Sequence, residues 1–105
     1  MTTIKITRTQ TEIKSILIAD HSMFGKSGQD IVCASISTLA FYTVNALKAF
    51  DKDRYVESKV DEANVTIAFN VKHREEISQT LLELLIQHLF ELEKQYKKNI
   101  TIEEK

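Results

Sequence analysis

The chain has 105 residues, of which 43% are hydrophobic and 28% are charged, and its formal net charge is −1. This length suits one compact domain over residues 1–105, and the composition excludes an intrinsically disordered chain. The nearly neutral balance gives no positive field that would attract phosphates, so we expect no nucleic-acid partner.

The N-terminal region predicts two adjacent strands. Apolar and polar residues alternate over residues 2–8, and a second run follows over residues 12–19. The second run ends in Ile16-Leu17-Ile18-Ala19, which predicts a strand near the middle of a sheet and covered on both faces. The first residues form no apolar signal, and no run approaches roughly 18 consecutive apolar residues. We therefore expect a cytoplasmic protein without a membrane partner.

The most irregular segment is residues 20–28, DHSMFGKSG, which holds both glycines of the chain, Gly25 and Gly28. Glycine gives the backbone unusual conformational freedom, and the chain contains no proline. We expect this segment to be a mobile loop next to Cys33.

An apolar stripe at helical spacing predicts a first helix over residues 29–50. Its start fits Ser27 or Gly28 near the N-cap, with Asp30 in the first turn, where negative charge suits the helix dipole. Cys33 then lies in the first or second turn.

The C-terminal half predicts a hairpin, a helix and a last strand. Alternation over residues 54–61 and 65–71 indicates the hairpin, residues 74–97 the second helix, and residues 100–102 the strand. The predicted fold class is α+β: a mixed four- to five-stranded sheet packed with two helices, in the order ββαββαβ, as a single domain.

The second helix is apolar on more than one side. Its main apolar face is predicted to hold Ile77, Leu81, Leu84, Leu85, Leu89 and Leu92. Leu82, Ile86 and Phe90 lie off that face and would be exposed in a small monomer. A homodimer interface is the simplest explanation.

A single cysteine, Cys33, excludes an intrachain disulfide and a thiolate zinc cluster, and we expect no metal and no cofactor. Cys33 is then either a small core residue or a reactive thiol. His21 follows a predicted buried strand, and the glycine-bearing loop between the two residues allows them to meet. An imidazole and a helix N-terminus both favour the thiolate. The pattern thus favours Cys33 as nucleophile and His21 as general base, with the core role still open.

Other polar groups near Cys33 have two possible roles each. The N–H groups of residues 31–33 are expected to lack intrahelical partners and to stabilise an oxyanion. Asp30 either caps the helix or orients His21. Ser37, one turn beyond Cys33, either hydrogen-bonds within the site or bonds its own backbone.

The remaining titratable residues indicate structural roles. His88 is flanked by leucines and is expected in the core or an interface, whereas His73 is expected to face solvent. The acidic pairs at residues 75–76 and at Asp51 and Asp53 suit a helix cap and a turn rather than a glycosidase pair. Three dispersed histidines and one cysteine make no metal-binding pattern.

The segment Gly28-Gln29-Asp30-Ile31-Val32-Cys33-Ala34-Ser35-Ile36-Ser37, with His21 before the loop, resembles the signature of the ribosomal-processing cysteine protease family (Prp). The resemblance covers essentially the whole chain. It implies a homodimeric endopeptidase that removes the N-terminal extension of bacterial large-subunit ribosomal protein twenty-seven, which functional ribosomes require. It also implies that His21 and Cys33 are the catalytic pair and that the loop moves over bound substrate.

The same resemblance implies an extended peptide substrate with large apolar residues before the cut. We assign Met23, Phe24 and Phe41 to the apolar pocket that such a peptide requires. One position departs from the family pattern: Asp20 precedes His21, where the family commonly has glycine. We expect the Asp20 side chain to point to solvent.

The predicted reaction begins with proton transfer from Cys33 to His21 and continues through thiolate attack, a stabilised oxyanion and hydrolysis of a thioester. Two other interpretations of the residues stay open. One is a non-catalytic ribosome-assembly or peptide-binding module with Cys33 in its core, and the other is a thiol redox sensor.

Overall fold

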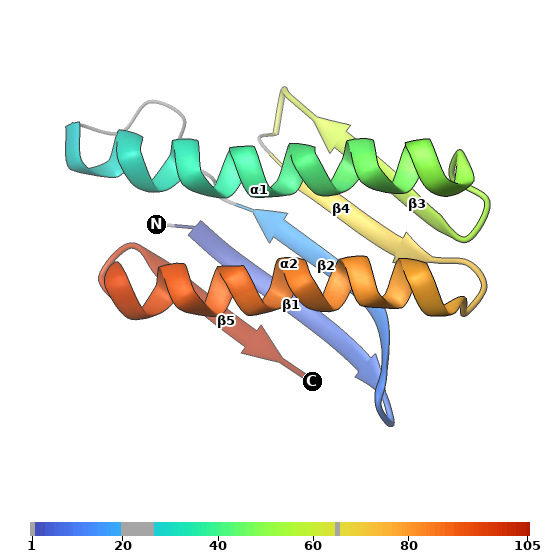
Figure 1. Cartoon of the computed structure of the whole chain (residues 1–105). Coiled ribbons are helices and arrows are strands. Elements are labelled where there is room, and N and C mark those ends of the chain that lie inside the picture. Colours follow the sequence, from blue (N-terminus) through green and yellow to red (C-terminus); the bar gives the residue numbers. More distant parts are fainter. Residues whose placement is uncertain (1, 20–26, 65) are drawn as a thin grey trace.

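The computed structural model describes residues 2–19, 27–64 and 66–105, and for residues 27–30 it describes the backbone alone. The elements are, in chain order, β1 (Thr2–Thr9), β2 (Glu12–Ala19), α1 (Ser27–Asp51), β3 (Val56–Asp61), β4 (Thr66–Val71), α2 (Glu76–Gln95) and β5 (Ile100–Glu104) (Figure 1). The predicted order ββαββαβ and the α+β class are confirmed.

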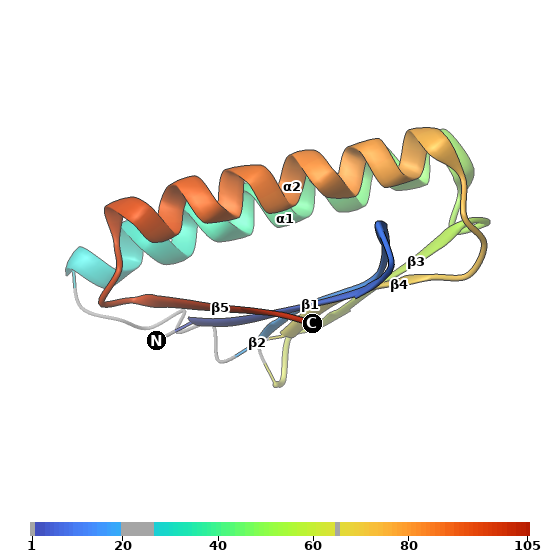
Figure 2. The ribbon, with the colours of Figure 1, turned by 90° about the horizontal axis from the view of Figure 1, so that it is seen from below.

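The five strands form one mixed sheet in the order β3-β4-β2-β1-β5. β5 runs parallel to β1, and the other neighbours are antiparallel. β2 is therefore the central strand, as its apolar sequence predicted. Both helices lie on the same face of this sheet (Figure 2).

The hydrophobic core lies between the sheet and the helix layer. Because side chains alternate along a strand, Ile4 and Ile6 of β1 and Ile16 and Ile18 of β2 all point toward the helices and are buried. The helices contribute the buried side chains of Val32, Ile36, Ala40, Leu47, Leu82, Leu85 and Leu89. This packing holds α1 firmly against the sheet.

The other face of the sheet is covered by neither helix (Figure 2). Leu17 and Ala19 point to that face and are half-buried, so the prediction that β2 is covered on both faces is wrong. Leu17 lies between Lys5 of β1 and Ala68 of β4. Cross-strand neighbours on both sides shield a central strand without a second layer.

The apolar faces of α2 differ from the prediction. Leu82 and Ile86 were expected to be exposed but are 0% and 3% exposed, whereas Leu84 of the expected core face is 46% exposed. The reason is Gln79, whose side chain turns inward to hydrogen-bond the backbone of Ile13. The buried stripe of α2 therefore continues from Gln79 through Leu82 to Ile86.

Within α1, the segment Ile31–Asp51 is long and apolar enough to cross a membrane by length and composition alone. The search for consecutive apolar residues missed it because serine, threonine and asparagine interrupt the segment. In the structure α1 lies on the sheet, and Val32, Ile36 and Leu47 are part of the core.

Candidate active site

Cys33 lies in the second turn of α1, as predicted, and its side chain is 7% exposed. Val32 and Ile36, its neighbours on the core side, are 2% and 0% exposed. Their burial fixes the orientation of this part of the helix on the sheet. The thiol is therefore carried by a rigid element close to the helix start.

Ser37 is half-buried and lies one turn beyond Cys33. Because each helical residue is turned by about 100° from the last, Ser37 and Cys33 share one side of α1. The neighbouring hydroxyls point elsewhere: Ser35 Oγ donates to Ile31 O at 2.9 Å. Ser37 is thus the hydroxyl placed on the Cys33 side of the helix.

The start of α1 corrects one expectation about the oxyanion. The helix begins at Ser27, so the N–H groups from Ile31 onward have carbonyl partners four residues earlier. The N–H groups of residues 31–33 are therefore engaged within the helix. The dipole effect also declines within the first turn, which leaves the imidazole as the main activator expected for Cys33.

Several predicted site residues lie outside the described part of the chain. They are Asp20, His21, Met23, Phe24 and Gly25. The described neighbours are Ala19, which ends β2 and pairs with Thr3, and Ser27, which begins α1 (Figure 1). The segment that holds His21 thus connects the central strand directly to the helix that carries Cys33.

Three further predicted site residues lie on α1. Gly28 and Asp30 belong to its first turns. Phe41 is 43% exposed and lies eight residues beyond Cys33, about 12 Å along the helix axis. An exposed ring at this distance is available to a bound peptide.

The other histidines and the acidic pairs have structural positions. His88 is exposed, not in the core, and its Nδ1 lies 2.8 Å from Leu84 O. His73 is exposed, as expected. Glu75 caps α2 by accepting hydrogen bonds from the N–H groups of Ile77 and Ser78 at 3.0 and 2.8 Å. Among the described residues, no three His, Cys, Asp or Glu side chains gather into a metal-binding group.

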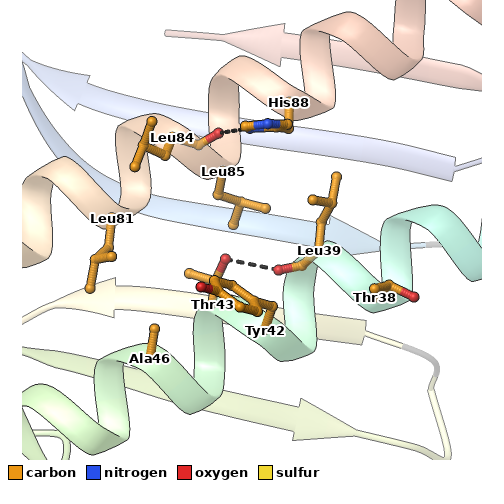
Figure 3. Close-up of a pocket in the computed structure, with 9 residues that line it drawn as sticks. All are labelled: Thr38, Leu39, Tyr42, Thr43, Ala46, Leu81, Leu84, Leu85 and His88. Atoms are coloured by element: carbon orange, nitrogen blue, oxygen red, sulfur yellow. Dashed lines mark hydrogen bonds between the residues drawn. The ribbon is translucent and has the colours of Figure 1, made fainter.

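The structure also contains a groove of about 310 Å³ between α1 and α2, which the sequence reasoning missed (Figure 3). This interhelix groove is lined by Thr38, Leu39, Tyr42, Thr43, Ala46, Leu81, Leu84, Leu85 and His88. Tyr42 lies about 180° around α1 from Cys33, so the groove and the thiol are on opposite sides of the helix. The available signal was the absence of charged residues from Ile31 to Leu47.

Comparison with known proteins identifies the family of this site. The model of the family "Cysteine protease Prp" matches residues 1–101. The ribosomal processing cysteine protease Prp of Staphylococcus aureus is 26% identical over 103 residues, which are 97% of each chain.

Solved structures show the same architecture. The S. aureus protease in complex with a substrate peptide superimposes with a TM-score of 0.89 at 24% identity, covering 100% of both chains. Its complex with a covalently linked product peptide gives 0.86 at 26% identity, again with complete coverage. A Streptococcus mutans protein gives 0.86 at 26% identity over 99% of this chain and 93% of that chain. The chain belongs to the Prp family of cysteine proteases, and the non-catalytic interpretation is wrong.

Proposed function

We propose that this protease removes the N-terminal extension of bacterial large-subunit ribosomal protein twenty-seven, with Cys33 as nucleophile and His21 as general base. The observation that carries the proposal is the position of the lone thiol. Cys33 lies in the second turn of α1, at the helix end that follows the segment containing His21. The S. aureus relative, a ribosomal processing protease solved with a substrate peptide, supports the substrate class.

In the proposed mechanism, His21 takes the proton of the Cys33 thiol, and the thiolate attacks the scissile carbonyl carbon. The C–N bond then breaks, and protonated His21 gives its proton to the leaving amine. Water next attacks the thioester while His21 accepts its proton, which releases the acid product and restores the thiol. The covalently linked product peptide of the S. aureus relative supports an intermediate of this kind.

The test is incubation of the protein with the extended ribosomal precursor, followed by mass spectrometry of the new N-terminus. We expect a single cut with wild type and no product with Cys33→Ala or His21→Ala. Ser35→Ala is the matched control in α1 and should cleave normally, because its hydroxyl bonds only its own helix backbone. An uncut precursor with wild type overturns the proposed substrate, and cutting by Cys33→Ala overturns the nucleophile.

We further propose that residues 1–105 form a single protease domain that acts in the cytoplasm as a homodimer, with neither metal nor cofactor. The support for the dimer is apolar surface on the helix layer, although different residues provide it than the sequence predicted. Tyr42, Ile77 and Leu84 are 73%, 51% and 46% exposed. Gel filtration with light scattering at several concentrations tests the oligomeric state.

A further inference from the structure

The outer surface of the helix layer carries unusually little charge. On α1, no charged residue occurs from Ile31 to Leu47, although Tyr42 and Phe41 in this span are largely exposed. Solvent-facing sides of helices ordinarily carry charged residues. An uncharged side of this length is typical of a surface that another molecule covers.

The interhelix groove runs along this surface. A second hollow of about 480 Å³ shares Thr38, Leu39 and His88 with it, so the two are continuous. α1 and α2 contain 25 and 20 residues, which gives lengths of about 37 and 30 Å. Two such helices packed roughly 10 Å apart present several hundred Å². This is close to the roughly 800 Å² per partner of a standard protein interface.

A second copy of the chain is the occupant that this chemistry favours. A twofold interface places each surface against itself, so any surface charge would meet a like charge near the axis. The helix surface avoids that repulsion because the side of α1 that lines the groove is uncharged. The open sheet face, in contrast, carries charged Lys5, Lys59 and Glu103 on three of its strands.

His88 lies where the two hollows meet, and it is the histidine of the groove lining. Its Nδ1 must carry a hydrogen to donate to Leu84 O at 2.8 Å, so Nε2 of the neutral ring is an acceptor (Figure 3). From α1 it is faced by uncharged Thr38, Leu39 and Tyr42. The charged neighbour on its own helix is Glu91, which lies 3.5 Å from the ammonium of Lys94.

We propose that a second copy covers the interhelix groove through the same residues, and that protonation of His88 on both copies weakens this interface. The inference rests on the homodimer proposed above and adds its surface and its regulation. Histidine changes charge between about pH 5 and 8. In a covered apolar groove the imidazolium loses hydration, so the dimer binds fewer protons than the separated chains. Association therefore strengthens as pH rises through this range.

The test measures the dimer dissociation constant by sedimentation equilibrium, without substrate, at pH 7.5 and 5.5 and equal ionic strength. We expect wild type to dissociate at least tenfold more readily at pH 5.5. At pH 7.5, Tyr42→Glu should weaken association at least a hundredfold, because it places two carboxylates in the interface. Thr7→Glu on the open sheet face is the matched control and should leave the constant unchanged. His88→Gln should abolish the pH dependence.

Three results overturn the inference. A wild-type protein that stays monomeric, or a dimer broken by Thr7→Glu and not by Tyr42→Glu, excludes the helix layer as the interface. Binding of monomers to phosphatidylglycerol vesicles through Tyr42 identifies lipid as the occupant instead. An unchanged pH dependence in His88→Gln excludes the histidine. Cys33→Ala should dimerise normally without cleaving, so failure of the interface and failure of the proposed peptidase are distinguishable.

Discussion

The side-chain amide of Gln79 on α2 forms two hydrogen bonds with the backbone of Ile13 on β2. Its Oε1 accepts from Ile13 N–H at 2.9 Å, and its Nε2 donates to Ile13 O at 3.0 Å. Ile13 lies two residues beyond Ser15, where the pairing of β2 with β4 stops. Gln79 thus takes the place of a neighbouring strand for one residue and joins the helix layer to the central strand.

Replacing Gln79 should destabilise the fold. Gln79→Ala leaves a buried N–H and C=O of Ile13 without partners, which costs about 2 to 4 kcal/mol in the free energy of unfolding. Gln87→Ala, on an exposed position of the same helix, is the control and should change it by less than about 0.5 kcal/mol. Urea unfolding followed by circular dichroism gives both values, and equal midpoints would refute the role of the Gln79 amide.

Local patterning predicted most of this fold. Strict alternation predicted the two hairpins, and β2 begins and ends at the predicted residues. The orientation of α2 was not predictable in the same way, because a glutamine at a helical position indicates solvent by default. Only the end of β4, which leaves Ile13 unpaired, explains why Gln79 turns inward. That relationship joins residues far apart in the chain and has no local signal.

The candidate site divides along a similar line. Cys33 in the second turn of α1 followed from helical periodicity and from a cap near Ser27. The expected oxyanion donors did not, because they depend on the first helical residue. A start two residues earlier than predicted places the N–H groups of residues 31–33 inside the helix ladder.

Ser37 should affect the reactivity of Cys33, whereas Ser35 should not. The two serines lie on the same helix, but only Ser37 shares the Cys33 side. We expect Ser37→Ala to lower kcat/KM about three- to tenfold, which corresponds to about 0.7 to 1.4 kcal/mol. The rate of Cys33 alkylation by iodoacetamide at several pH values should shift as well. The same unfolding midpoint combined with unchanged alkylation would assign Ser37 to a purely structural role.

Phe41 should contribute to binding of the apolar residues before the cut. Phe41→Ala is expected to raise KM several-fold, since burial of an aromatic side chain contributes about 1.5 to 3 kcal/mol and a peptide covers only part of the ring. Phe50→Ala is the matched control: Phe50 is 40% exposed on the same helix, but it lies at the far end and stacks on Tyr55. Equal KM values for the two variants would remove Phe41 from the substrate pocket.

Glu83 should give the fold a specific sensitivity to acid. Arg8 holds its carboxylate through two hydrogen bonds of 2.8 and 3.0 Å. The hydrogen bond from Arg8 lowers the pKa of Glu83, while partial burial opposes the change. A lowered pKa in the folded state means that the contribution is complete above about pH 4.3, the ordinary value for glutamate, and is lost as pH falls through the folded pKa.

The side chain of Glu83 is 46% exposed, so solvent screening limits this contribution to about 0.5 kcal/mol. Denaturant unfolding at pH 7, 4 and 3 should show that wild type loses this amount relative to Glu83→Gln between pH 7 and 3. Glu91→Gln, whose carboxylate lies 3.5 Å from Lys94, is the control and should follow wild type. Parallel pH profiles for wild type and Glu83→Gln would mean that the ion pair to Arg8 contributes nothing measurable, and that packing alone joins β1 to α2.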